Sequence, residues 1–272
     1  MEIHIMTEEI LGKARIHFDE FTKSHIKEVE VNLIDDLKLK KEHSLRVAEL
    51  CCQIAQKQQF EKNDCRLAEL IGLVHDMGRF PQYVKYQTFD DSKSEDHTLL
   101  GIKLLEETDF FKELSEADQH IVKQSIESHN KLTVTAKDKR TMLFCQILRD
   151  ANKLDIWDMT VSFLKKDGTF SNSTFCYNLP MLSGVSDVVI KTLSSGKVLQ
   201  KKDLQSINDY KLFQMSQIFD LNFKVSFEIL NKKQLIKKIY DTLPKRDDVI
   251  NYYRQIRLLI ENKFVNQQGH YS

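Results

Sequence analysis

Five expected helices each place one histidine or aspartate on an apolar face, with Asp76 directly after one of these histidines, and together these side chains could bind a metal ion. His43 precedes Val47 and Cys51 by four and eight residues, so it continues the buried face of its helix. An isolated carboxylate is costly to bury, whereas imidazoles and carboxylates that converge from several helices suit a divalent cation. The candidate ligands are His43, His75, Asp76, His97, His129 and Asp150.

Each histidine also has a plainer interpretation as a core residue with a satisfied hydrogen bond. Five coincident helical placements, one of them a His-Asp pair, favour the metal site over that interpretation. The donors are nitrogen and oxygen without thiolate, which suits manganese, iron, nickel, cobalt, zinc or magnesium. We therefore predict one or two divalent metal ions, and the donor set does not choose among these metals.

Helices must supply most of the framework that positions these residues. Only three prolines and eight glycines interrupt the 272 residues, which favours long helices over many short strands. Polar stretches at 81–95 and 166–186 are expected to be loops, the second with a short hairpin. We predict an all-α fold, a helical bundle, with one or two helices in 7–39 and further helices near 42–59, 63–75, 96–108, 116–129, 138–159, 187–194, 203–219, 222–241 and 246–263.

The polar stretch after Lys165 suggests a boundary between two parts of the chain. Residues 1–165 are expected to form the metal-binding helical core together with the N-terminal helices. Residues 166–272 are expected to form a loop or short hairpin and a helical extension that packs on the core.

Charge and cysteine content argue against several classes of protein. Forty basic residues balance forty acidic ones, so there is no strong nucleic-acid signal, and lysine runs such as 38–41 are expected to be solvated helix faces. Five cysteines without a CxxC pair argue against a disulfide framework or a structural zinc site. No signal peptide and no apolar run of about 18 residues is visible, so we expect a cytoplasmic protein without a membrane span.

Three segments resemble the H…HD…D signature of the HD superfamily, whose members are all-helical, metal-dependent phosphohydrolases. The segments are 42–47, 73–80 and 148–155, and the resemblance covers residues 40–160. It implies that one metal is bound by His43, His75, Asp76 and Asp150. His97 and His129 resemble the extra histidines of members with two metals, in which Asp76 would be the bridge. The alternative is a single metal, with His97 and His129 binding substrate phosphate or acting as an acid.

Two departures from related subfamilies narrow the expected activity. Guanosine-polyphosphate hydrolases carry acidic residues soon after the His-Asp pair, whereas Met77, Gly78 and Arg79 follow it here. Cyclic-di-GMP phosphodiesterases of the HD-GYP type have a second histidine beside the fourth ligand, whereas Asn130 follows His129 here. Neither activity is expected.

The resemblance implies hydrolysis of a nucleotide or another small phosphorylated substrate by a metal-activated water. Asp76 is the candidate to orient that water, and Arg79 and Lys153 are candidates to neutralise the phosphate, although plain ion pairs would explain both cations equally well. The alternatives are a non-catalytic nucleotide-sensing or regulatory protein and, less favoured, a di-iron oxygenase of HD-like fold. A homo-oligomer is compatible with the sequence.

Overall fold

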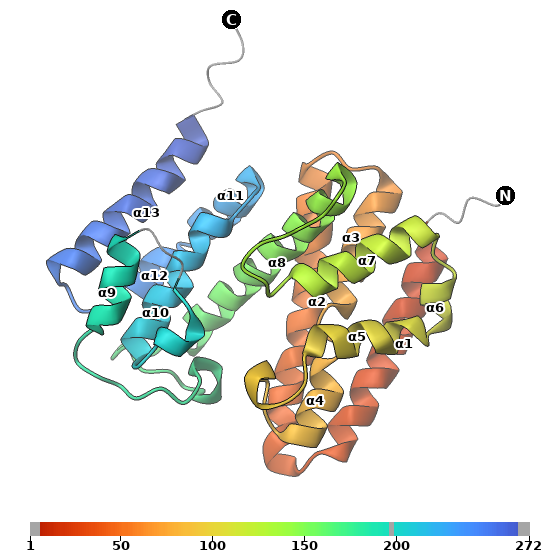
Figure 1. Cartoon of the computed structure of the whole chain (residues 1–272), viewed down its shortest axis with the longest axis horizontal. Coiled ribbons are helices and arrows are strands. Elements are labelled where there is room, and N and C mark those ends of the chain that lie inside the picture. The colour runs from red at the N-terminus through yellow and green to blue at the C-terminus, as the bar shows by residue number, and fades with distance from the viewer. Residues whose placement is uncertain (1–5, 196–198, 266–272) are drawn as a thin grey trace, which may run out of the picture. The chain divides into compact units, whose positions relative to one another are not determined.

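The computed structural model describes residues 6–195 and 199–265, and most of these residues lie in helices joined by loops (Figure 1). No strand occurs in them, and the one isolated bridge, between Leu164 and Phe170, is antiparallel. The all-α prediction is confirmed. None of the described helices is both long and apolar enough to cross a bilayer.

The contacts divide the chain into two units, Met1–Asn152 and Lys153–Ser272, and the division falls inside α8 (Lys139–Phe163). The first unit also contains α1 (Glu8–Glu28), η1 (Val31–Leu33), α2 (Ile34–Lys57), α3 (Lys62–Val74), α4 (Arg79–Tyr86), η2 (Asp91–Lys93), α5 (His97–Glu106), α6 (Asp109–Lys112) and α7 (Glu116–Ser128). The second contains η3 (Thr174–Cys176), α9 (Asp187–Ser194), η4 (Lys201–Asp203), α10 (Ile207–Ser216), η5 (Gln217–Asp220), α11 (Lys224–Lys232), α12 (Leu235–Asp241) and α13 (Asp247–Val265). The predicted boundary at Lys165 and the packing of the C-terminal region on the core stay predictions.

Two expected elements differ from the structure. The stretch 81–95 was expected to be a loop, but α4 extends to Tyr86 and includes Pro81. Pro81 lies in the first turn of α4, where a helix has no intrahelical partner for its N–H groups, so the proline costs little. The helix expected over 222–241 is instead divided into α11 and α12 at Gln234, whose φ of 53° is left-handed.

A close backbone contact joins α2 and α3 and brings two candidate ligands together. A Cβ atom added to Gly72 on α3 would lie 2.7 Å from Cα of Ala48 on α2, so only glycine allows this approach. The rings of His43 on α2 and His75 at the end of α3 consequently lie with their centroids 5.2 Å apart. The small residue therefore sets the spacing of the two histidines.

A second close contact joins the start of α4 to the start of α5. A Cβ atom added to Gly78 would lie 2.7 Å from the backbone nitrogen of Gly101 and would collide with the carbonyl oxygen of His97. Gly78 comes two residues after Asp76, and His97 is the first residue of α5. This contact therefore sets the distance between Asp76 and His97.

Buried polar side chains of α10 organise the second unit. Asn208 donates hydrogen bonds to the carbonyl oxygens of Leu182 and Gly184, and the Asp209 carboxylate accepts one from the backbone N–H of Ser186. The side chains of Asn208 and Asp209 therefore hold the end of the polar stretch 166–186, which was expected to be a loop. Burial lowers the pKa of the neighbouring Lys211 to about 8.

We predict that Gly78→Ala lowers the free energy of unfolding by about 1–3 kcal/mol, because the methyl group forces α4 and α5 apart. Gly12→Ala is the control, since nothing lies within 4 Å of a Cβ added at Gly12 on α1. This change within α1 should raise stability by about 0.5–1 kcal/mol through helix propensity. Urea denaturation of both variants measures the difference, and equal effects would contradict the proposed contact.

Candidate metal centre

Two helix ends orient two of the candidate histidines. His75 follows the last residue of α3 and His129 that of α7, where the final carbonyl groups have no intrahelical donor. Nδ1 of His75 lies 2.7 Å from the carbonyl oxygen of Gly72, and Nδ1 of His129 lies 2.7 Å from that of Ile126. A carbonyl oxygen only accepts, so each Nδ1 carries the proton. In the neutral rings Nε2 is therefore left with a lone pair.

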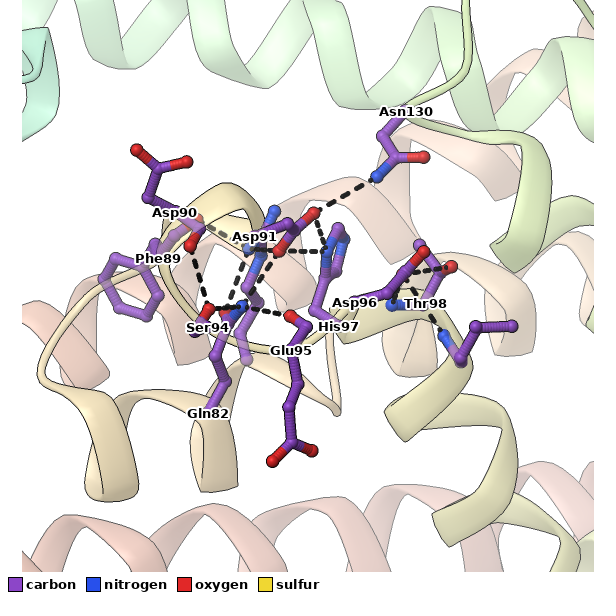
Figure 2. A network of polar contacts seen from close by, with 12 residues as sticks. Gln82, Phe89, Asp90, Asp91, Ser94, Glu95, Asp96, His97, Thr98 and Asn130 are labelled. Atoms are coloured by element: carbon purple, nitrogen blue, oxygen red, sulfur yellow. Dashed lines mark hydrogen bonds and ion pairs between the residues drawn. The ribbon is translucent and has the colours of Figure 1, made fainter.

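His97 and His43 approach the same place from a helix start and a helix interior. The Asp96 carboxylate caps α5 by accepting from the backbone N–H groups of Thr98 and Leu99, which makes His97 the first residue of the helix. Nδ1 of His97 lies 2.8 Å from Oδ2 of Asp91 (Figure 2). His43 lies within α2 and is buried.

The Asp76 carboxylate lies at the centre of these four imidazoles. Its Oδ2 is 3.7 Å from Nε2 of His43 and 3.6 Å from Nε2 of His75. Its Oδ1 is 3.5 Å from Nε2 of His97 and 3.9 Å from Nε2 of His129. Each carboxylate oxygen therefore faces two imidazole nitrogens. His43, His75 and Asp76 form one group with metal-ligand spacing, and Asp76, His97 and His129 form another.

The donor atoms fit a bound cation. Nε2 of His75 is buried and has no hydrogen-bond partner among the described residues, and Nε2 of His97 lies 3.3 Å from Nε2 of His129. When Nδ1 of each ring holds the only ring proton, the Nε2 lone pairs face one another and a carboxylate oxygen, which is repulsive. A divalent cation would accept these lone pairs, and the donor spacing of the two groups that share Asp76 suits one cation in each.

The protonation states also suit metal binding, which requires neutral imidazoles and an ionised carboxylate. Burial lowers the pKa of His75 to about 4. Burial lowers the pKa of His129 well below its usual value, and the nearby imidazoles of His97 and His75 lower it further, because neighbouring positive charges would repel. Burial alone would raise the pKa of Asp76, but the positive charges around it, Lys40 first, hold that pKa well below its usual value.

Lys40 is a site residue that sequence reasoning missed. Its Nζ lies 2.8 Å from Oδ2 of Asp76, and its side chain is 23% exposed. The run 38–41 was expected to be a solvated face, and for Lys40 this is wrong. Lys40 precedes His43 by three residues, so it lies one turn away on the same side of α2, and that spacing was the available signal.

Arg79 and Lys153, the two residues predicted to neutralise the substrate phosphate, lie in different surroundings. Nε of Arg79 lies 3.6 Å from Oδ1 of Asp76, while its Nη1 donates to Oδ1 of Asp91 and to the carbonyl oxygen of Phe89. Lys153 belongs to the second unit and forms an ion pair with Asp220 at 2.6 Å. Catalytic roles for Arg79 and Lys153 stay predictions.

Asp150 is fully buried on α8, as expected from its helical spacing. It lies close enough to α2 for its charge to contribute to the raised pKa of Cys51, for which burial is the main cause. The preceding Arg149 donates to the carbonyl oxygens of Ser128 and Lys131, on either side of His129. The part of α8 around Asp150 is thus anchored beside a candidate ligand, and the membership of Asp150 in the ligand set stays a prediction.

One comparison with known proteins gave a match. The family model of the HD domain matches residues 41–157, which include all six candidate ligands. Neither the curated proteins nor the solved structures contain a match to this chain.

We predict that Asp76→Ala abolishes binding of both metal ions and keeps the helical content, because it removes the one side chain shared by the two groups. His129→Ala should lower the metal content by about one equivalent. Elemental analysis after loading with manganese, zinc or iron measures the ratio, and circular dichroism monitors the helices. An unchanged metal content in His129→Ala would favour the single-metal alternative.

Proposed function

We propose, from the match of residues 41–157 to the family model of the HD domain, that the chain is a metal-dependent phosphohydrolase. The substrate class we favour is a nucleotide or a related small phosphoester. The observation that carries the proposal is the buried Asp76 carboxylate, with two imidazole Nε2 atoms facing each of its oxygens. The proposed ligands are His43, His75, Asp76, His97, His129 and Asp150, for one or two ions of manganese, iron, nickel, cobalt, zinc or magnesium.

When bound, divalent ions lower the pKa of water and neutralise charge on phosphoryl oxygens. The side chains of this protein would supply the rest of the chemistry. The ionised Asp76 carboxylate accepts hydrogen bonds and can therefore orient an attacking water toward phosphorus. The imidazoles would direct Nε2 at the centre, because Nδ1 of His75, His97 and His129 has an acceptor of its own.

A cation at the edge of the centre supports action on a phosphoester. Lys40 reaches Asp76 with its ammonium group, and its side chain is partly exposed, so the group is accessible to a substrate. Phosphoryl transfer needs positive charge near the equatorial oxygens, and an ammonium group provides it. We propose that Lys40 contacts the substrate phosphate, with Arg79 and Lys153 as the earlier candidates for this role.

The partners and the compartment are part of the same proposal. A chain with balanced charge has no general attraction for polyanions, so recognition of phosphate has to be local to the centre. This favours a small phosphorylated substrate over a nucleic acid. We further propose a cytoplasmic protein, and a homo-oligomer is compatible with the proposal.

Two other functions use the same residues. A nucleotide-sensing or regulatory protein would bind the substrate without turnover, but it would have no need of six buried donors. A di-iron oxygenase would need the same nitrogen and oxygen donors together with iron. The complete ligand set and the partly exposed Lys40 favour the phosphohydrolase.

We predict that the purified protein hydrolyses at least one member of a panel of nucleotides and generic phosphoesters, with a rate that depends on the added metal. Asp76→Ala should reduce release of phosphate to background, since that variant loses the metal centre. Nucleotide binding without turnover under every metal would support the sensor. Oxygen consumption by the iron-loaded protein without phosphoester cleavage would support the oxygenase.

We predict that Lys40→Met raises KM about tenfold and leaves the metal content unchanged, because it removes a charged hydrogen bond to the substrate worth about 1.5 kcal/mol. Lys41→Met is the matched control, since the adjacent Lys41 pairs with Asp19 at 2.6 Å. Steady-state kinetics on the best substrate of the panel compares the two. A changed metal affinity with an unchanged KM would make Lys40 a counter-ion of Asp76 only.

A further inference from the structure

The position of His97 in its helix leaves its Nδ1 without a local acceptor. At the C-terminal ends of α3 and α7, carbonyl groups that lack a helical partner accept the Nδ1 protons of His75 and His129. At the N-terminal end of a helix the unpartnered groups are N–H donors, which cannot accept a proton. His97 is the first residue of α5, so its Nδ1 proton needs an acceptor from another segment.

Asp91 supplies this acceptor from the segment between α4 and α5. Its Oδ2 lies 2.8 Å and its Oδ1 lies 3.0 Å from Nδ1 of His97. Oδ1 also accepts from Nη1 of Arg79 at 2.6 Å and from Nε2 of Gln82 at 2.9 Å. Figure 2 shows Gln82 directed at Asp91. Asn130, the residue after His129, directs its amide nitrogen at Oδ2 from 3.5 Å. All four neighbours are donors, so the carboxylate acts only as an acceptor.

The segment is fastened on both sides of Asp91, so the carboxylate has a defined place. Arg79 donates to the carbonyl oxygen of Phe89 at 2.7 Å, before Asp91. Gln82 donates to Oγ of Ser94 and to the carbonyl oxygen of Glu95, both at 2.8 Å, after Asp91. Arg79 and Gln82 follow Asp76 by three and six residues, so the chain that carries Asp76 also holds Asp91.

We propose that Asp91 is a positioning residue that holds the proton of His97 on Nδ1 and so directs the Nε2 lone pair of His97 toward Asp76 and His129. This inference rests on the proposed metal centre and adds a residue to it. A carboxylate that accepts from the distal nitrogen of a ligand histidine selects the tautomer and increases the basicity of the coordinating nitrogen. Arg79 then contributes by holding Asp91 in place.

The variant Asp91→Asn tests the proposal because its orientation is determined by the neighbours. Arg79 and Gln82 both donate to Oδ1, so we expect the new side chain to place its carbonyl oxygen there and its NH₂ group at the Oδ2 position, which is the closer of the two to Nδ1 of His97. An NH₂ group donates to Nδ1 and moves the ring proton to Nε2, where it blocks coordination. Asp91→Glu keeps two acceptor oxygens and should restore the original tautomer.

Nitrogen-15 NMR of the imidazole rings in the metal-free full chain reads the tautomer directly, with His97→Gln identifying the signal. We expect Nδ1–H in the wild type, Nε2–H in Asp91→Asn and Nδ1–H in Asp91→Glu. Zinc titration by calorimetry should show the second ion bound about 10–100-fold more weakly by Asp91→Asn. Ser92→Ala is the control, since the exposed Ser92 hydroxyl donates to Asp90, and the variant keeps the contacts of Asp91 with Arg79, Gln82 and His97. Its tautomer and zinc affinity should match those of the wild type.

The outcomes separate this inference from the proposed function. A folded Asp91→Asn protein that keeps the Nδ1–H tautomer of His97 and binds two zinc ions normally would overturn the role of Asp91 and leave the phosphohydrolase standing. A wild-type protein that takes up no divalent ion would overturn the proposed function. The tautomer of the metal-free protein would then still decide whether Asp91 positions His97.

Discussion

A buried negative charge is the constraint on which the first unit depends. Asp76 is 3% exposed and ionised, and an unpaired carboxylate in such a place would cost several kcal/mol. Lys40 and Arg79 compensate part of this charge from the edge, and a cation bound among the imidazoles would compensate the rest. The helices around Asp76 are therefore arranged to bring positive charge and lone pairs to one point.

The helix termini contribute to this electrostatic balance. α3 and α7 end at His75 and His129, so the negative ends of two helix dipoles lie at the centre and favour a cation there. The same termini select the tautomers of both histidines through backbone carbonyl groups. At these two helix ends the backbone alone therefore selects the tautomer. His97 lies at a helix start, where it needs the Asp91 carboxylate for the same purpose.

Close backbone packing gives the centre its dimensions. Gly72 against Ala48 and Gly78 against Gly101 allow helices to approach at distances that any larger residue would prevent. Ligand atoms have to lie within about 0.5 Å of their working positions, and backbone contacts hold them more tightly than flexible side chains do. The glycines therefore influence the proposed chemistry although they carry no functional group.

The sequence by itself determined the all-α class and the burial of His43, His75, Asp76, His97, His129 and Asp150, because helical periodicity is a local property of the chain. Only the tertiary structure decided that Lys40 pairs with Asp76, that α4 occupies an expected loop, and that Asp91 faces His97. These features depend on contacts between separate segments and on the turn that joins α3 to α4. Spacing along one helix places Lys40 beside His43 but does not encode these contacts, since they follow from how closely separate helices pack.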